Sequence, residues 1–544
     1  MLLGSQCRPH RRLTQIAGSI RRYSSDEQLK YVQRKSVVAQ NPAQFYPPIT
    51  TTRSNSPVLR VPDFVRKFKE TNFESYPQKR LPDTVQLEGR VKSVRKAGKA
   101  LFFLDIIQDD VEVQICASNK LLGSMGKDEF SEIHSFIRKG DHILCVGFPS
   151  VTNVGELTLK VNSPIRISSP CLNLATLPDK VTDRQLINAN RVMNYLVNDQ
   201  LKQRILIKDT VTQSIRKFLI DDDFTEVNTP LIAGAGTGAN AEPFQTSLKA
   251  VPDEKLLLRV APELWLKKLV VGGFDKVFEI GPNFRNEGID ATHNPEFMTC
   301  EFYRSHTSLS ELMKMTEGVF TAIYNGLSQK EQKISLLKET LPELTSLQQG
   351  NFAKYEFVPT LEKKTGIKLP EELTTESLVA YHRDAGVPLP STKSPASLLD
   401  NLSSRIIEAI SLENRNQPIF IYNQPAVMSP LAKSALVDYD GREYEVSMRF
   451  ELFINGKEYV NSYEEENSPF SQAEKFRLQQ QAKAEYNDDE LLIPDWNYVK
   501  LMEYGLPPTG GWGCGIDRLS MLFSGTNRIE DVLTFGVLKD VVRQ

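Results

Sequence analysis

The chain has 544 residues, too long for one small domain, and this length predicts about two to four folding units. Its hydrophobic and charged fractions, 40% and 25%, are ordinary for a globular protein. No run approaches the roughly eighteen apolar residues of a membrane span, so membrane insertion is not expected. A formal net charge of −2 argues against wholesale coating of nucleic acid but leaves room for a local basic track. The six cysteines form no CxxC pair, which argues against structural zinc or a disulfide framework.

Residues 1–24 contain five arginines and no acidic residue. Leu13, Ile16 and Ile20 recur at helical spacing, so a helix here would have one apolar face and be basic elsewhere. This composition is typical of a mitochondrial transit peptide, and residues 22–25 resemble a matrix-protease cleavage site. The mature chain is therefore expected in the mitochondrial matrix. The alternative is a disordered basic arm that holds RNA in the cytosol.

Residues 25–80 are polar and rich in proline and serine, with about twice as many basic as acidic residues. Only residues 63–71 show a helical pattern. The segment is therefore expected to be a mostly loose, basic N-terminal extension.

Residues 81–170 have the pattern of short β-strands separated by turns. One helix is expected over 129–138, and strands are expected at 85–91, 111–115, 143–148 and 156–161. About five such strands with one helix fit a small barrel such as an OB-fold. A small β-sandwich is the alternative.

Residues 171–204 are expected to form a hinge, and residues 205–544 a larger α+β domain. The larger domain begins with a helix whose apolar stripe ends near Ile220, followed by an extended segment, 224–230, that stops at a proline. Residues 308–416 are mostly helical in pattern and carry few chemical signals. They are expected to be an insertion in this domain.

The first chemical cluster lies in residues 277–288, where a β pattern ends in a polar turn that carries Arg285 and Glu287. Residues 293–297 lead into a return strand, 298–303. A planar guanidinium suits phosphate or carboxylate, because its fork binds two oxygens at once. A salt-bridged hairpin is the structural alternative.

The second cluster, residues 449–465, predicts a hairpin with an Asn-Gly turn. Glu451 and Glu458 flank the turn and could hold Mg²⁺, which prefers one or two carboxylates together with substrate phosphates. Strand alternation places on one face Asn461, Tyr463 and Glu465. An acidic surface strand is the alternative.

The third cluster, residues 510–519, is rich in glycine and would let a strand approach a flat ligand closely. A helix is expected to start near Asp517, with Arg518 at its electropositive end. The sequence has no Walker motif. Gly234, Gly236 and Gly238 form only a weak GxGxG pattern, which is interpreted as a mobile loop.

The order of these clusters is more specific than any one of them. Residues 224–230, 284–287 (FRNE) and 513–518 (GCGIDR) resemble motifs 1, 2 and 3 of the class II aminoacyl-tRNA synthetases. The segments that resemble the lysyl members of that class are 259–264 (RVAPEL), 284–289 (FRNEGI), 293–297 (HNPEF), 301–303 (EFY), 428–433 (MSPLAK) and 503–508 (EYGLPP). The resemblance runs from about Pro62 to the C-terminus.

This resemblance implies an α+β protein, in which an N-terminal OB-fold barrel that binds the anticodon precedes a catalytic domain. The catalytic domain would be an antiparallel sheet flanked by helices. The sequence departs from the family pattern in three places. The loop 233–241 is unusual, Thr292 replaces the arginine of bacterial relatives, and Glu464 and Glu466 make one strand unusually acidic. These departures concern loop contacts rather than the reaction.

The resemblance also implies that ATP is a substrate and Mg²⁺ a cofactor. Arg285 would bind both the α-phosphate and the amino-acid carboxylate. Glu287 and His293 would contact the nucleotide, and Phe297 would stack on adenine. Arg518 would hold the γ-phosphate, and Glu451 and Glu458 would hold the metal.

The residues that match the family's amino-acid pocket are acidic. Glu301, Tyr303 and Glu465 would surround the side-chain ammonium of lysine, because a buried ammonium needs opposite charge and acceptors. The remaining matched residues are Glu263 and Gly238 for the α-amino group, Asn461 for the carboxylate, and Tyr463.

In the barrel, Phe103 matches a residue that stacks on an anticodon base and Gln114 one that reads a base edge. Glu156 is a further candidate. Stacking on exposed aromatic rings is a general mode of RNA recognition. Packing of Phe103 in the core is the alternative.

The resemblance implies a lysine–tRNA ligase that works as a homodimer, with lysine tRNA, lysine and ATP as partners. The dimer follows from motif 1, which forms a two-fold interface in this class. One alternative is an aspartyl or asparaginyl enzyme, which would need cationic residues where the pocket glutamates lie. The other is a catalytically inactive, RNA-binding paralogue, against which the intact arginines and glutamates of the three clusters argue.

Overall fold

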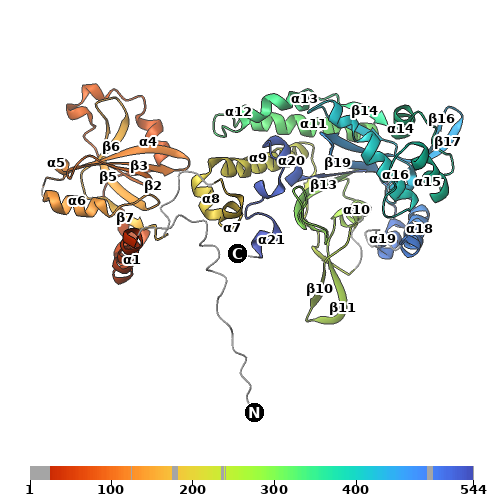
Figure 1. Cartoon of the computed structure of the whole chain (residues 1–544), viewed down its shortest axis with the longest axis horizontal. Helices are drawn as coiled ribbons and strands as arrows, with labels where there is room; N and C mark the ends of the chain where they lie inside the picture. Colours follow the sequence, from red (N-terminus) through yellow and green to blue (C-terminus); the bar gives the residue numbers. More distant parts are fainter. Residues whose placement is uncertain are drawn as a thin grey trace, which may run out of the picture. The chain divides into compact units, whose positions relative to one another are not determined.

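The structure is a computed structural model, and the chain divides into two compact units, residues 1–180 and 181–544 (Figure 1). The expected transit peptide, residues 1–24, lies outside the described residues. Within the described part of the chain, no helix has the length and apolar character needed to cross a membrane. The described residues are 25–123, 125–173, 182–234, 238, 241–486 and 494–542.

The first unit is built on a seven-stranded sheet in the order β1-β2-β3-β4-β6-β5-β7, which closes on itself because β2 also pairs with β5. This closure confirms the expected barrel and excludes the sandwich. The strands are β1 (Val58–Leu59), β2 (Val85–Lys96), β3 (Leu101–Gln108), β4 (Val111–Ser118), β5 (His142–Val151), β6 (Leu157–Val161) and β7 (Arg166–Ser169). Helices α5 (Asn119–Leu122) and α6 (Lys127–Ser135) follow β4, so the expected helix begins earlier than predicted.

The expectation of a loose N-terminal extension is wrong. The segment forms α1 (Ser25–Gln40), α2 (Pro42–Phe45), α3 (Ile49–Thr52) and α4 (Val61–Phe68). Val38 and Phe64 join the apolar core of the barrel. Arg34, only 2% exposed, pairs with the buried Asp141 at 2.6 Å. The Arg34–Asp141 pair joins positions 107 residues apart, so local pattern could not reveal it.

Much of the expected hinge is also helical. Residues 174–181 lie outside the described part, but α7 (Arg184–Ala189) and α8 (Arg191–Val197) belong to the second unit. The buried Arg191 donates hydrogen bonds to the carbonyl oxygens of Glu530 and Leu533. The C-terminal segment therefore holds this stretch in place.

The second unit contains an eight-stranded sheet in the order β14-β15-β18-β19-β20-β13-β12-β8. Its central pairings are antiparallel, whereas β8 and β14 pair in parallel at the two edges. This confirms the expected α+β architecture. The strands are β8 (Thr225–Glu226), β12 (Lys276–Phe284), β13 (Glu296–Ser305), β14 (Ala353–Glu356), β15 (Ile419–Tyr422), β18 (Arg449–Ile454), β19 (Lys457–Glu464) and β20 (Thr509–Gly515).

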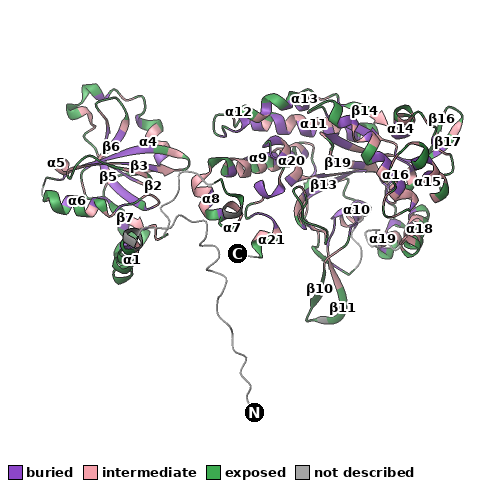
Figure 2. Ribbon diagram, in the orientation of Figure 1, coloured by how far each residue is buried: buried purple, intermediate pink, exposed green. Residues whose placement is uncertain are grey.

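One face of this sheet packs on α9 (Asp199–Asp221), α11 (Leu309–Ser328) and α20 (Ile516–Phe523). Phe302 and Trp512 stack in this core with ring centroids 4.9 Å apart. Cys300 and Cys514, both buried, occupy directly paired positions on β13 and β20. Figure 2 shows the buried strands in the middle of the unit and exposed residues on the outer helices.

The other face belongs to a smaller core that includes Val277 and Tyr303, next in sequence to the inward-facing Phe278 and Phe302. Strand alternation therefore divides the sheet into an α9–α11 face and an opposite face. The helices on the opposite face are α10 (Glu263–Val271), α18 (Pro469–Tyr486) and α19 (Trp496–Met502).

The region expected to be a helical insertion is mostly helical, but it is not wholly separate from the sheet. Helix α11 covers the sheet core, and β14 adds a strand to its edge. The rest contains α12 (Leu337–Thr340), α13 (Thr345–Gln349), α14 (Phe357–Thr365), α15 (Thr375–Asp384), α16 (Pro395–Leu402) and α17 (Ile410–Glu413).

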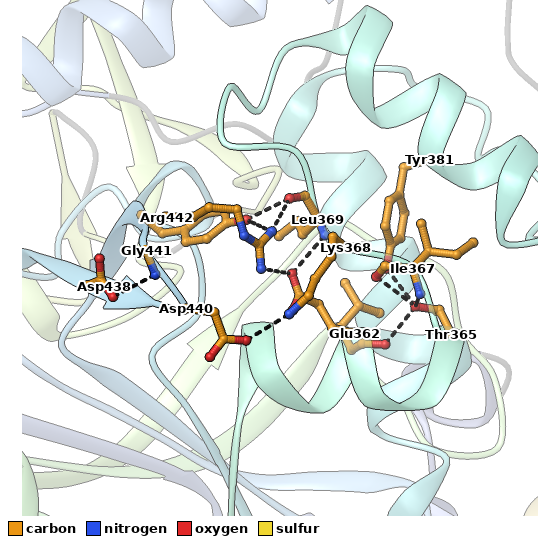
Figure 3. A network of polar contacts seen from close by, with 12 residues as sticks. Glu362, Thr365, Ile367, Lys368, Leu369, Tyr381, Asp438, Asp440, Gly441 and Arg442 are labelled. Atoms are coloured by element: carbon orange, nitrogen blue, oxygen red, sulfur yellow. Dashed lines mark hydrogen bonds and ion pairs between the residues drawn. The ribbon is translucent and has the colours of Figure 1, made fainter.

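A polar network joins this region to the hairpin of β16 (Ser434–Tyr439) and β17 (Arg442–Ser447), as Figure 3 shows. Arg442 donates to Glu362 at 2.7 Å, and Lys368 bridges Glu362 and Asp440 at 2.9 Å each. Two smaller elements complete the unit: the β10 (Gln245–Leu248) and β11 (Val251–Leu258) hairpin with β9 (Ile232–Ala233), and the C-terminal α21 (Leu538–Val541).

Candidate active site

A cavity of about 500 Å³ opens on the sheet face opposite α9 and α11. Residues from the three sequence clusters and from the segment 259–264 meet here, although they span more than two hundred positions of the chain. The lining includes Glu263, Arg285, Glu287, His293, Phe297, Glu301, Tyr303, Glu451, Glu458, Asn461, Tyr463, Glu465 and Arg518.

Arg285 follows β12, and its backbone N–H donates to the Pro295 carbonyl at 2.9 Å. Its guanidinium carbon lies 5.1 Å from the centre of the Phe297 ring. Its Nε is buried and has no hydrogen-bond partner. A buried donor without a partner costs free energy unless a ligand accepts from it, so the cavity offers an anion-binding position here.

Arg518 comes from the first turn of α20, as the glycine-rich cluster predicted. Its guanidinium donates to the Glu458 carbonyl at 2.8 Å and lies 3.2 Å from His293 Nε2. His293 Nδ1 lies 2.9 Å from Asp290. Hydrogen bonds from the Thr292 backbone and from His293 hold the pKa of Asp290 well below its usual range. Arg518 and His293 thus form a second polar position in the cavity, at which Arg518 supplies the positive charge, and Glu287 lies exposed at its lining.

Glu451 and Glu458 lie on neighbouring strands and both line the cavity. Glu451 accepts hydrogen bonds from Arg449 and from Gln424. Burial raises the pKa of Glu451 to about 7; Arg449 opposes the rise and Glu458 adds to it. A cation between the two carboxylates would relieve this repulsion.

Within the described ranges, no group of three or more histidine, cysteine, aspartate or glutamate side chains could hold a metal. Two carboxylates supplemented by nucleotide oxygens are nevertheless a donor set that suits Mg²⁺. The residues therefore fit the metal that the sequence analysis expected, in a site that the nucleotide must help to complete.

One part of the cavity is acidic and buried. The Tyr303 hydroxyl donates to Glu301 Oε2 at 3.2 Å, and the Tyr463 hydroxyl to Glu263 Oε1 at 2.5 Å. Burial, and next the charge of Glu263, raises the pKa of Glu301 to about 8. Burial also raises the pKa of Glu465 to about 8, although the charge of Lys267 opposes it.

Lys267 is the residue that sequence reasoning missed. Its ammonium is fully buried and donates to Glu263 Oε1 at 2.9 Å and to Glu465 Oε2 at 2.8 Å. The pair with Glu263 has the i,i+4 spacing of one helix face, which was the available sequence signal. The pair with Glu465 joins positions 198 residues apart and left no local signal.

Gly238 is buried near the cavity without lining it. Its backbone φ is +106°, and an added Cβ would lie 2.8 Å from the Glu263 Cβ. Only glycine suits this conformation and space. Residues 235–237 and 239–240 of the unusual loop lie outside the described part of the chain. Asn461, by contrast, is tied to the strands, because its Oδ1 accepts from Arg449 Nε at 2.9 Å.

The unusually acidic positions 464 and 466 have structural partners outside the cavity. Glu464 accepts from the Leu309 backbone N–H at 2.8 Å, at the start of α11. Glu466 is buried and pairs with Lys475 of α18 at 2.8 Å. These two departures from the family pattern are therefore used to attach helices to the sheet.

In the barrel, Phe103 is half-buried and alternates with the core residues Phe102 and Leu104. It therefore does not lie in the core, which removes the structural alternative for this ring. Gln114 is buried and donates to the exposed Glu156 at 2.8 Å, while its Oε1 has no partner. The two polar candidates thus contact each other and leave one free acceptor.

Comparison with known proteins agrees with this geometry. Residues 183–539 match the model for class II tRNA synthetases (D, K and N), and residues 85–167 match the OB-fold nucleic acid binding domain. The catalytic unit is thus that of a class II aminoacyl-tRNA synthetase.

The individual relatives show which amino-acid specificity within the class the chain resembles. The chain is 37% identical to the mitochondrial lysine–tRNA ligase of Saccharomyces cerevisiae, over 95% of this chain and 93% of that protein. It is 38% identical to the mitochondrial lysine–tRNA ligase of Schizosaccharomyces pombe, over 83% and 84%. It is 34% identical to the lysine–tRNA ligase of Thermotoga maritima, over 84% and 86%. The chain belongs to the lysine–tRNA ligase family.

The glycines of β20 generate a prediction about the acidic part of the cavity. In a Gly511→Ala variant the new Cβ would lie 1.9 Å from Glu465 Oε1 and 2.7 Å from Tyr303 Cε1, so the carboxylate must move. We expect the KM for the amino acid in ATP–pyrophosphate exchange to rise roughly tenfold or more. Gly513→Ala is the matched control, because its nearest neighbour, Glu301 Cγ, would lie at an ordinary 3.4 Å. Equal effects of the two variants would contradict this assignment.

Proposed function

We propose that the chain activates lysine with ATP and esterifies it to the 3′-terminal adenosine of a lysine tRNA for mitochondrial translation. The first step gives lysyl-adenylate and pyrophosphate. The observation that carries the proposal is the cavity itself, in which buried glutamates and two arginines, Arg285 with an unpartnered donor, line one space. An acidic pocket suits the cationic side chain and the arginines suit a triphosphate.

At the nucleotide end, Arg285 binds the α-phosphate together with the lysine carboxylate and thereby aligns the two reactants. Phe297 stacks on adenine, Glu287 and His293 contact the nucleotide, and Arg518 holds the γ-phosphate. A carboxylate oxygen of lysine attacks the α-phosphorus, and the bond to the leaving pyrophosphate breaks. No side-chain nucleophile is needed, so catalysis consists of positioning and electrostatic stabilisation.

Glu451 and Glu458 are proposed to hold Mg²⁺ together with phosphate oxygens. When bound, the metal offsets the negative charge that accumulates on the leaving pyrophosphate. The raised pKa of Glu451, which follows from burial and the neighbouring Glu458, supports this role, because Arg449 offsets only part of the cost of ionising the buried carboxyl and a bound cation would offset more.

At the amino-acid end, Glu301, Tyr303 and Glu465 receive the side-chain ammonium. Glu263 and the Gly238 backbone receive the α-amino group, Asn461 the carboxylate, and Tyr463 orients Glu263 through its 2.5 Å hydrogen bond. An aspartate side chain would meet buried carboxylates here, and like charges repel strongly where water is excluded. The pocket therefore disfavours the aspartyl alternative.

The barrel is proposed to read the anticodon of the tRNA. Phe103 offers a ring outside the core for stacking, and Gln114, held by Glu156, offers a free acceptor to a base edge. Stacking and edge recognition are how folded proteins read unpaired bases.

Amino-acid-dependent ATP–pyrophosphate exchange tests the activity. We expect exchange with lysine and none with aspartate or asparagine, and Glu465→Gln should raise the lysine KM about 100-fold while changing the ATP KM little. Lys475→Gln, which also breaks a pair to a neighbouring glutamate but outside the cavity, serves as the control. Exchange with aspartate alone would indicate the aspartyl alternative. Tight tRNA binding without any exchange would indicate an inactive paralogue.

A homodimer is proposed because α9 and the following strand resemble motif 1, and an isologous dimer is the commonest soluble assembly. Sedimentation equilibrium is expected to give twice the monomer mass of 61.5 kDa, less any residues removed by processing. A fully active monomer across the concentration range of the assay would disprove the dimer.

The mitochondrial matrix is proposed as the location, on the composition of residues 1–24 and the names of the yeast relatives. N-terminal sequencing of protein from purified mitochondria is expected to begin near Ser24 or Ser25. Full-length protein confined to the cytosol would instead indicate that the segment is an RNA-binding arm.

A further inference from the structure

A buried cation of the protein contacts two of the carboxylates that line the amino-acid pocket. Lys267 lies on α10, is 0% exposed, and pairs with both Glu263 and Glu465 without lining the cavity itself. Its ammonium also lies 5.4 Å from the centre of the Tyr498 ring. Burial alone lowers the pKa of Lys267, but Glu263 and Glu465 outweigh burial and leave the pKa well above its usual value.

The contact with Lys267 occupies one of the two carboxylate oxygens of Glu465 and leaves the other without a partner. Oε2 accepts from the Lys267 ammonium, whereas Oε1 is buried and has no partner. Oε1 lies directly over Gly511, close to the Tyr303 ring, because a Cβ at Gly511 would meet both. By holding Oε2, the side chain of Lys267 fixes the direction in which Oε1 of Glu465 is available to a ligand.

The charges in the pocket can be compared with those of the substrate. Glu263, Glu301 and Glu465 carry three negative charges when ionised, and Lys267 compensates one of them. Two negative charges remain, and the substrate lysine brings two ammonium groups. Arg285 faces the substrate carboxylate separately. The two remaining negative charges of the pocket match the two ammonium groups of a diamino acid. An amino acid with an uncharged side chain would leave one carboxylate buried without a partner.

We infer that Lys267 is a specificity-determining positioning residue, whose ammonium bridges Glu263 and Glu465 so that the pocket retains two oriented carboxylates for the two ammonium groups of a diamino acid. The inference rests on the proposed function, since it takes lysine as the substrate. Lys267 acts through the two glutamates and does not touch the reacting atoms.

Lys267→Met tests the inference because it removes the charge and keeps an unbranched side chain. In ATP–pyrophosphate exchange we expect the lysine KM to rise about 10- to 100-fold and the ATP KM to change less than about threefold. Lys267→Gln is the second variant, since its amide still donates hydrogen bonds and is better tolerated beside two carboxylates. It should also raise the lysine KM, because the charge is lost.

Lys268→Met is the matched control. Lys268 is the next residue of the same helix and also forms an ion pair, at 2.5 Å to Asp495, but this partner does not line the cavity, whereas both partners of Lys267 do. Its lysine KM should stay at the wild-type value. Thermal unfolding of all three variants identifies general loss of structure.

The pH profile supplies a readout that a merely structural role would not change. In wild type, the lysine KM should rise as pH falls below about 8, because the carboxyls of Glu301 and Glu465 take up protons and cannot pair with an ammonium. Without Lys267, the group that lowers the pKa of Glu465 is gone, so the rise should begin at higher pH. The groups that face Glu465 are Lys267 and Glu263 from α10, Glu301 and Tyr303 from β13, Tyr463 from β19 and Tyr498 from α19.

The possible outcomes distinguish a failure of the proposed function from a failure of the proposed role of Lys267. Wild-type protein without lysine-dependent exchange overturns the proposed function. Normal wild-type exchange with an unchanged lysine KM in Lys267→Gln overturns the role of Lys267. An equal rise of the lysine and ATP KM values, with an unshifted pH profile, also overturns it, because that pattern indicates a purely structural residue.

Discussion

The alternation of side chains across the antiparallel sheet is the constraint on which the rest of the catalytic unit depends. Adjacent residues of β13 face opposite ways: Phe302 packs against Trp512 in the core, while Glu301 and Tyr303 line the cavity. A shift of register by one residue would place carboxylates in the apolar core and aromatic rings in the cavity. The apolar face therefore does more than stabilise the unit, because it determines which residues can meet a substrate.

The glycines of β20 follow the same alternation of side chains between the two faces of the sheet. Gly511 and Gly513 lie on the cavity face, and Trp512 between them fills the core. The strand thus gives maximal packing on one face and almost no side-chain volume on the other. Glu465 and Tyr303 occupy the space that a side chain at Gly511 would take.

Much of this could be predicted from the sequence, because the informative patterns are local. Period-two alternation indicated the barrel strands, and the resemblance of the three clusters, in their order, to class II motifs indicated which residues would line one site. The α1 helix and its packing were not predictable in this way, because its buried Arg34 pairs with Asp141, far along the chain. Lys267 was missed for the same reason: its second partner, Glu465, reaches it only through the fold. Local pattern identifies elements and motifs, whereas buried ion pairs between distant positions depend on tertiary structure.

The paired cysteines in the middle of the sheet have a consequence for redox chemistry. Cys300 and Cys514 occupy directly opposite positions on β13 and β20, and burial raises the pKa of both thiols far above the usual value. Oxidants attack the thiolate, and access to it requires exposure. Neither condition is met while the sheet is folded, so the two thiols are protected from oxidation although they lie on strands that line the cavity. Oxidative inactivation at this pair would therefore have to follow unfolding of the sheet rather than precede it.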